Sequence, residues 1–363
     1  MRILQIMHDE ERGGILTLAT MIEEGLADHG IEIETACLFP RPGLGTTAKL
    51  RCVAAMARRI LRGGFDGLMA YQATASVLVG VIGRLQGCPI RIVHQTCMPQ
   101  ETAWPVRLAD RIAGSLGSYT VNIMNSVATR DAFADYPRAY RRSTALIEHG
   151  LDVPLPSHAR ERTRARFGLA ADRHLLLNVG RLVAQKNQHV LVRALAHLPL
   201  AHLAIAGDGP DRDALLVLAA ELGVGDRLHL LGAVSSADVA DLLVAADLFV
   251  FPSTWETFGL AAVEAAMCGL AVIASDLPVL REVLSTRTPA LAQFVPMHDL
   301  DAWAAAIRHA IDAPAPPDAL RNWSVELADK YSRERMIEGY LRLLRPAAAT
   351  PVLRGSLVRG ASG

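Results

Sequence analysis

The chain has 363 residues, of which 51% are hydrophobic and 20% charged, enough apolar material for two cores of ordinary domain size. Its 37 basic and 37 acidic residues cancel, which argues against nucleic acid as the main partner. Five scattered cysteines without a Cys-x-x-Cys spacing argue against a disulfide framework or zinc site and favour a reducing, cytoplasmic setting.

The first half of the chain alternates apolar, strand-like runs with helical patterns. Its opening residues read as a strand and not as a signal peptide, because charged side chains interrupt them early. A helix is expected over 15–29, closed by Gly30 where a left-handed residue is favoured. No uncharged apolar run reaches the ~18–20 residues that span a bilayer, so we expect a soluble or peripheral protein. The expected strands are 2–7, 31–38, 66–71, 90–94, 119–123 and 144–148.

The second half repeats this plan more clearly. An apolar stripe at helical spacing runs from Val190 to Leu198, and the Ser235-x-x-Asp238 spacing predicts a capped helix start. Regular strand–helix alternation predicts parallel sheets with right-handed crossovers. The fold class is therefore α/β, with two Rossmann-like domains facing across a cleft. The expected strands are 175–180, 203–207, 228–232, 248–253 and 271–275.

These patterns divide the chain into five parts. Two prolines followed by a charged helical start suggest a linker between the domains, and the last residues have no convincing period. The expected parts are an N-terminal Rossmann-like domain (1–155), a linker (156–172), a C-terminal Rossmann-like domain (173–330), a helix packing back toward the N-terminal domain (331–345) and a mobile tail (346–363).

Open α/β sheets bind ligands at the carboxyl ends of their strands. Arg181 and Lys186 follow the first strand of the second half, where a forked guanidinium and an ammonium could neutralise a diphosphate. Ordinary solvated loop cations explain the same pattern equally well. The Gly-Asp-Gly-Pro run at 207–210 is a turn signal, and the backbone at 232–234 could lie against a flat base.

The strongest signal follows the fourth strand of this half, at 251–265. A polar loop with Glu256 leads through Gly259 into an apolar helix containing Glu264. The free N–H groups of that helix's first turn suit a phosphate, and the carboxylates suit sugar and ribose hydroxyls. A purely structural Glu264 is costly among small apolar neighbours unless it is paired.

Four pieces in this order, NVGRLVAQKN, AGDGP, LLGAV and ETFGLAAVE, resemble the donor-binding domain of retaining glycosyltransferase family 4, which has the GT-B fold. The match is strong between 177 and 282. The resemblance implies that the C-terminal domain (173–330) binds the donor and the N-terminal domain (1–155) the acceptor. It implies transfer of a sugar from a UDP- or GDP-sugar to a saccharide or lipid-linked acceptor without metal or other cofactor. By analogy with the family, this would serve polysaccharide or glycolipid assembly.

The resemblance also implies roles for individual residues. Arg181 and Lys186 would bind the diphosphate, Glu256 the donor sugar and Glu264 the ribose. The remaining donor-binding candidates are the backbone amides of Phe258, Gly259 and Leu260, and a base pocket lined by Gly232, Ala233 and Val234.

The N-terminal half adds three candidates by the same resemblance. Gly13 and Gly14 would let backbone approach the donor, although they also fit a simple turn. His94 would contact donor sugar or acceptor, although a single histidine at a strand end is often structural. The family frequently has Asn-Gly before an Asp at the linker entrance, and here the sequence from 148 to 152 is EHGLD.

Two questions stay open at this level. Basic residues cluster with apolar ones over 49–62 and near Arg138, Arg141 and Arg142, which fits either an anionic membrane surface or a solvated helix face. A non-catalytic nucleotide-sugar-binding subunit and a nucleotide-sugar epimerase on the same fold are the alternatives to a transferase.

Overall fold

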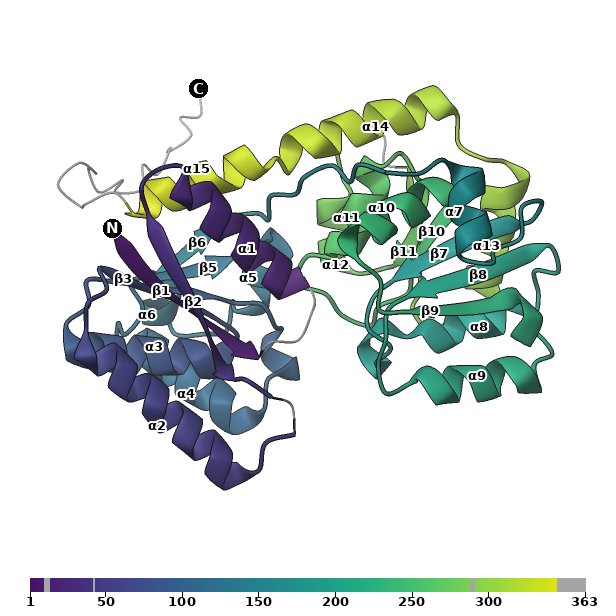
Figure 1. The fold of residues 1–363 in the computed structure, drawn as a ribbon. Helices are drawn as coiled ribbons and strands as arrows, with labels where there is room; N and C mark the ends of the chain where they lie inside the picture. The colour runs from purple at the N-terminus through teal and green to yellow at the C-terminus, as the bar shows by residue number, and fades with distance from the viewer. Residues whose placement is uncertain (10–13, 42, 288–290, 345–363) are drawn as a thin grey trace, which may run out of the picture.

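The computed structural model describes residues 1–9, 14–41, 43–287 and 291–344. It contains two α/β domains side by side, each built on a six-stranded parallel sheet (Figure 1). The α/β fold class predicted from the sequence is confirmed. Helices cover both faces of each sheet, and this explains why the strands are apolar on both sides.

The N-terminal sheet has the strand order β2-β1-β3-β4-β5-β6. All six expected strands are present, with ends that shift by a few residues. Its strands are β1 (Arg2–Asp9), β2 (Glu32–Phe39), β3 (Gly67–Tyr71), β4 (Ile90–His94), β5 (Val121–Met124) and β6 (Thr144–Leu146).

Two groups of helices enclose this sheet. One face packs against α1 (Gly14–Ala27) and the C-terminal helix α15 (Arg333–Leu344). The other face is covered by a row formed by α2 (Thr46–Arg62), α3 (Ala73–Gln86), α4 (Trp104–Ser115) and α6 (Arg138–Arg141). Shorter segments are η1 (Pro99–Glu101) and α5 (Val127–Ala132).

The C-terminal sheet has the order β12-β11-β10-β7-β8-β9. The five expected strands are present, and β12 is an additional edge strand. The strands are β7 (His174–Val179), β8 (Ala201–Ala206), β9 (Leu228–Gly232), β10 (Leu248–Phe251), β11 (Val272–Ser275) and β12 (Ala292–Val295).

Helices surround this sheet as well, and the predicted capping box at Ser235 and Asp238 is formed at the start of α10. The helices are α7 (Arg160–Arg166), η2 (Ala184–Lys186), α8 (Gln188–Leu195), α9 (Arg212–Glu221), η3 (Gly225–Arg227), α10 (Ser236–Ala245), α11 (Leu260–Met267), α12 (Pro278–Val283), α13 (Leu300–Asp312) and α14 (Pro317–Lys330).

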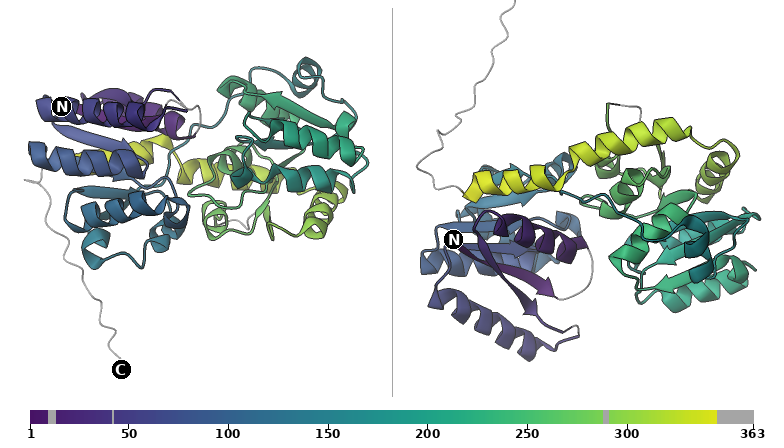
Figure 2. Two further views of the ribbon diagram at one scale, coloured as in Figure 1. Left: turned by 90° about the horizontal axis from the view of Figure 1, so that it is seen from below. Right: turned by 45° about the horizontal axis from the view of Figure 1, so that its top comes forward.

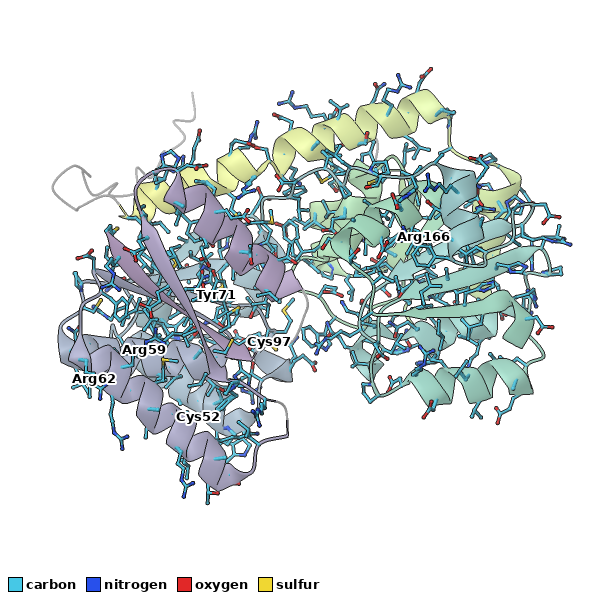
Figure 3. The ribbon with its side chains drawn as sticks, in the orientation of Figure 1. Cys52, Arg59, Arg62, Tyr71, Cys97 and Arg166 are labelled. Atoms are coloured by element: carbon cyan, nitrogen blue, oxygen red, sulfur yellow. The ribbon has the colours of Figure 1, made fainter. Side chains whose placement is uncertain are left out.

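Residues 156–172, expected as a linker, instead belong to the C-terminal domain. Helix α7 packs against α10, and Figure 3 shows Arg166 on this side of the domain. The Arg164 guanidinium is buried and pairs with Asp247 at 2.8 Å. The Asp241 carboxylate accepts from the N–H groups of Ser157 and His158 at 2.6 and 2.9 Å. These buried partners fix the segment in place. The sequence shows only that the segment is charged, and it does not show that the charged side chains have partners.

The chain crosses between the domains at two adjacent places. After β6, the Leu151 N–H donates to the Tyr331 carbonyl at 2.7 Å, where α14 ends. Helix α15 then packs on α1, as predicted for a helix returning to the N-terminal domain, and Figure 2 shows α14 and α15 running over both domains. Gly150 is required here, since a Cβ would come within 2.7 Å of Arg333 Cα. The expected tail at 346–363 lies outside the described residues.

Candidate functional site

The carboxyl ends of β7, β8 and β9 are brought together by close backbone packing. The Gly207 N–H donates to the Gly232 carbonyl at 2.8 Å. Gly207 has φ +148°, and a Cβ there would lie 1.9 Å from the Gly180 carbonyl oxygen. Only glycine fits this position. The AGDGP turn therefore holds two strand ends in contact, which brings the loop after β7 close to the start of the 232–234 segment.

The loop after β7 is fixed by amide side chains. Asn187 adopts φ +52°, and its Nδ2 donates to the carbonyls of Pro252 and Met297, both at 3.1 Å. Gln188 Nε2 donates to the Arg181 carbonyl at 2.9 Å. These contacts tie the loop to the ends of β10 and β12. Both amide residues directly follow Lys186 in the sequence, and sequence analysis did not identify their role.

A second set of contacts joins the β7 loop to the β10 loop. The Thr254 N–H donates to the Gln185 carbonyl at 2.8 Å, and Gln185 Nε2 donates to the Trp255 carbonyl at 3.0 Å. Lys186 and Glu256 lie next to these hydrogen bonds and form an ion pair, with Lys186 Nζ 2.5 Å from Glu256 Oε1. Their side chains are only 17% and 10% exposed. An ammonium has three donors, so Lys186 can hold Glu256 and still donate to a bound anion.

The N-terminus of α11 lies directly after this pair. Gly259 has φ +90° and turns the chain into the helix, while the Phe258 ring is buried against His149 and Tyr331. The predicted segment 258–260 thus forms a fixed helix start. Gly14 of the N-terminal domain reaches the same place, since a Cβ on it would lie 2.6 Å from Leu260 Cδ1. Gly13 lies outside the described residues.

Glu264 lies about one turn into α11, partly buried on the side that also carries Cys268. Burial raises the pKa of its carboxyl group above the ordinary value. The same burial, together with Glu264, raises the pKa of the Cys268 thiol to about 12. A carboxylate in this setting gains from a hydroxyl donor, and this fits the expected contact with a ribose.

The other donor-binding candidates lie around these loops. Arg181 is exposed at the start of the β7 loop. Gly232 has φ +74°, and the segment from Gly232 to Val234 is partly exposed between β9 and the capped start of α10. The structure thus gathers Arg181, Lys186, Glu256 and Gly232 on the loops at one edge of the C-terminal sheet.

His94 has a different environment from the one expected. Its ring is stacked on Tyr71 and is buried beneath α15. Nδ1 lies 2.9 Å from the Ala70 carbonyl, and Nε2 lies 2.9 Å from the Tyr340 hydroxyl. Burial lowers its pKa to about 4, so the ring is neutral. Both ring nitrogens are engaged within the fold, and we assign His94 to the packing of α15 instead of to contact with a substrate.

The structure adds residues that the sequence did not indicate. Asn125 and Ser126 follow β5 in the N-terminal domain and contact Thr257, the residue after Glu256. His149 packs on Phe258, and its Nε2 lies 2.9 Å from Asn125 Nδ2. Burial lowers the pKa of His149 to about 3. Single polar residues after strands form no recognisable sequence motif, so only the fold shows that Asn125, Ser126 and His149 lie beside the Glu256 loop.

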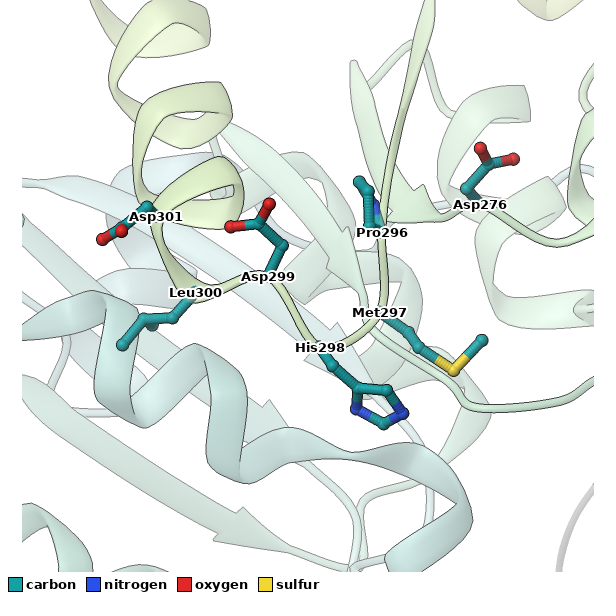
Figure 4. Close-up of a pocket in the computed structure, with 7 residues that line it drawn as sticks. All are labelled: Asp276, Pro296, Met297, His298, Asp299, Leu300 and Asp301. Atoms are coloured by element: carbon teal, nitrogen blue, oxygen red, sulfur yellow. The ribbon is translucent and has the colours of Figure 1, made fainter.

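A hollow lies beside the β11 and β12 ends, lined by residue 276 and residues 296–301 (Figure 4). Two of its three acids have structural partners: Asp276 pairs with Arg281 at 2.5 Å, and Asp299 caps α13. The sequence has Asp-x-Asp triplets at 211–213 and 299–301, and both stand at helix starts. Within the described ranges, no three His, Cys, Asp or Glu side chains gather as a metal site.

Two similar structures define the class of fold. Sucrose-phosphate synthase from Thermosynechococcus elongatus superposes with a TM-score of 0.79 at 21% identity, covering 95% of this chain and 98% of that one. Anabaena HepE in complex with UDP-glucose gives a TM-score of 0.80 at 20% identity, covering 95% and 99%. The chain thus has the GT-B fold, with two Rossmann-like domains.

Sequence comparison gives the family. Residues 159–325 match the model of the glycosyl transferases group 1. D-inositol 3-phosphate glycosyltransferase of Mycolicibacterium smegmatis is 32% identical over 257 residues, which are 66% of this chain and 58% of that relative. D-inositol 3-phosphate glycosyltransferase 1 of Catenulispora acidiphila is 29% identical over 309 residues, which are 78% of this chain and 73% of that relative. Residues 159–325, somewhat less than half of the chain, thus match a glycosyl transferases group 1 domain.

Proposed function

We propose that this protein transfers a sugar from a nucleoside-diphosphate sugar to a hydroxyl acceptor. The observation that carries the proposal is the Lys186–Glu256 pair, held at 2.5 Å between two loops beside the start of α11. This arrangement offers a cation and helix N–H groups to a diphosphate, and a carboxylate to the sugar next to it. Glu264 would accept from the ribose hydroxyls.

The same groups support transfer without a metal ion. As the glycosidic bond breaks, negative charge grows on the diphosphate, and Lys186, Arg181 and the start of α11 would stabilise it. The sugar then resembles an oxocarbenium ion, and Glu256 can stabilise it through its hydroxyls. Retention of the anomeric configuration follows if the leaving phosphate accepts the proton of an acceptor on the same face.

The comparisons indicate which substrates to test first. The HepE structures contain UDP, glucose or UDP-glucose, which favours UDP-sugars over GDP-sugars as the initial donors. The relatives' names make an inositol phosphate the first small acceptor, followed by saccharides and lipid-linked sugars. A cytoplasmic role in polysaccharide or glycolipid assembly, with the acceptor held by the N-terminal domain, fits these classes.

A thermal-shift panel of UDP, GDP and their sugars, with and without EDTA, tests the donor site. A specific ligand at a hundredfold excess over Kd stabilises by about 2.7 kcal/mol, so the shift is measurable. We expect one donor to raise the midpoint in EDTA, and Glu264→Ala to abolish that rise. Glu221→Ala is the matched control, because Glu221 is an exposed glutamate at the end of α9 in the same domain.

Turnover separates a transferase from the alternatives. The transferase consumes donor only when an acceptor is added, an epimerase converts donor alone, and a non-catalytic subunit binds donor without converting it. The anomeric configuration of the product, read by NMR, tests retention. Donor binding that needs a divalent cation would contradict the metal-free proposal.

A further inference from the structure

Helix α4 carries an apolar stripe on its outer side. Trp104, Leu108 and Ile112 are 69%, 48% and 51% exposed, and Leu116, directly after the helix, is 66% exposed. A spacing of four residues places these side chains along one side of the helix. The opposite side, with Asp110 and Ala113, is buried against the sheet. The stripe is thus a second apolar surface, separate from the one that packs the core.

The stripe continues onto the end of α3. Helices α3 and α4 pack against each other, and the Arg84 guanidinium donates to the Leu116 carbonyl. Leu85, next to Arg84, is 74% exposed. We call the exposed side chains of Leu85, Trp104, Leu108, Ile112 and Leu116 the α3–α4 stripe.

Basic residues accompany the stripe. Helix α6 packs on α4 and contributes the exposed Arg138 and Arg141, and the exposed Arg142 directly follows it. Arg111 lies on α4 itself, 5.5 Å from the Tyr136 ring. Helix α2 packs on α3, and Figure 3 shows its Arg59 and Arg62. The basic residues of the four-helix row are Lys49, Arg51, Arg58, Arg59, Arg62, Arg84, Arg107, Arg111, Arg138, Arg141 and Arg142.

Acidic residues are nearly absent from this row. Helices α2, α3 and α6 contain none, and the one acid of α4, Asp110, is buried and accepts from the Tyr119 and Tyr140 hydroxyls. Exposed acids stand in neighbouring segments, at Asp66, Glu101, Asp131 and Asp135, and the Glu34 carboxylate on β2 pairs with Arg59. Because the whole chain is neutral, this concentration of positive charge on one domain face is a local feature.

We propose that the α3–α4 stripe docks on an anionic lipid bilayer, with the surrounding arginines on the lipid phosphates. Among the helices that the structure describes, none is long and apolar enough to cross a membrane. A tryptophan beside aliphatic and arginine side chains suits the boundary between headgroups and acyl chains. The flanking charge selects an anionic surface. This surface is separate from the Lys186–Glu256 site, and the inference goes beyond the proposed function.

Vesicle co-sedimentation of the full chain tests the docking surface. Vesicles of phosphatidylcholine with about 30 mol% phosphatidylglycerol are compared with pure phosphatidylcholine at about 0.1 M salt, where screening acts beyond ~10 Å. We expect binding to the anionic vesicles only, reduced at least about fivefold by Leu108→Asn with Ile112→Asn and by Arg138→Gln with Arg142→Gln.

Matched variants on the C-terminal domain serve as controls. Leu216→Asn with Val217→Asn removes two aliphatic side chains of similar exposure, 46% and 58%, from α9. Arg193→Gln with Arg321→Gln removes two exposed arginines. Both controls should bind vesicles as the unchanged protein does. All variants should keep the donor-induced thermal shift, so failure of the docking surface and failure of the donor site can be told apart.

Trp104 provides a direct reporter of insertion. Of the four tryptophans in the chain, Trp303 and Trp323 are fully buried and Trp255 is partly buried. Brominated lipids should quench the fluorescence of the bound protein, and Trp104→Phe should retain vesicle binding but lose the quenching. Three results would overturn the proposal. They are absence of binding to anionic vesicles, binding by Leu108→Asn with Ile112→Asn equal to that of the unchanged protein, and a dimer of the unchanged protein that this double variant abolishes.

Discussion

The Ser126 hydroxyl of the N-terminal domain donates to the Thr257 carbonyl of the C-terminal domain at 3.0 Å. The Thr129 hydroxyl donates to the same carbonyl at 2.9 Å. Thr257 stands between Glu256 and the Phe258 that begins the turn into α11. The loop that carries the Glu256 carboxylate is therefore attached directly to the opposite domain, and the orientation of the two domains is coupled to the geometry of the site.

Removing both hydroxyls should weaken catalysis without unfolding the protein. Each hydrogen bond contributes about 0.5–1.5 kcal/mol, so Ser126→Ala with Thr129→Val should lower kcat/KM for transfer by roughly tenfold. Small-angle scattering should show a broader range of domain separations. Thr144→Val is the control, since its hydroxyl bonds only within the N-terminal domain, to the Arg141 carbonyl. An unchanged kcat/KM would show that this attachment is irrelevant to the site.

Lys186 and Glu256 should stabilise the fold only as a pair. Both side chains are largely buried, so Lys186→Met leaves a carboxylate without its cation and should cost about 2–4 kcal/mol of unfolding free energy. Lys186→Met with Glu256→Gln should recover more than half of that loss. Urea unfolding of the two single variants and the double variant measures the coupling. Additive losses in this cycle would contradict the pairing.

The strands of both sheets could be predicted because apolar runs between helical patterns mark strands covered on both faces. The Glu256 and Glu264 elements were visible because local spacing places them at one strand end. Strand β12 has only four residues, including the exposed Gln293, and offers no such run. The contacts of Ser126 with Thr257 join residues 131 positions apart and depend on how two domains meet. No local pattern encodes that meeting.

The placement of 156–172 illustrates the same limit. Prolines and charges at its start are typical of a linker, yet Arg164 is buried because five acceptor atoms converge on its guanidinium: the carbonyls of residues 170, 171, 173 and 245, and Asp247. A charged residue reads as exposed until such partners are known. His94 is the opposite case, since a strand-end histidine suggested a site and Tyr340, 246 positions later, occupies its Nε2.

Glu264 should bind nucleotide at a cost to stability. Burial raises the pKa of this carboxyl group in the folded state, so its ionised form opposes folding at neutral pH, and this penalty declines as pH falls. Glu264→Gln should therefore raise Tm at pH 7 by a few degrees, about 1–3 °C, while weakening UDP binding. Calorimetry and thermal unfolding measure the two effects, with the exposed Glu221→Gln as control. A lower Tm for Glu264→Gln would mean that the carboxylate is stabilised by its surroundings.

His94 should make the fold sensitive to acid. Its pKa is about 4 in the folded protein and 6.5 in an ordinary environment, so the unfolded chain takes up a proton first as pH falls. The resulting stability is complete above about pH 6.5 and is lost as pH drops toward 4, by about 2 kcal/mol at pH 5. His149, with a pKa of about 3, should act in the same direction.

Urea unfolding at about pH 7.5 and pH 5 separates this effect from simple loss of packing. His94→Phe retains a ring against Tyr71 but leaves the Ala70 carbonyl and Tyr340 hydroxyl unpaired, which should cost about 1–3 kcal/mol at the higher pH. Between pH 7.5 and pH 5, the free energy of unfolding should fall by about 2 kcal/mol less in this variant than in the unchanged protein, because position 94 then has no imidazole to protonate. His309→Asn, at an exposed position on α13, should leave the pH dependence as it is. If His94→Phe keeps the full pH dependence, the acid sensitivity arises elsewhere and His94 is not the group that protonates.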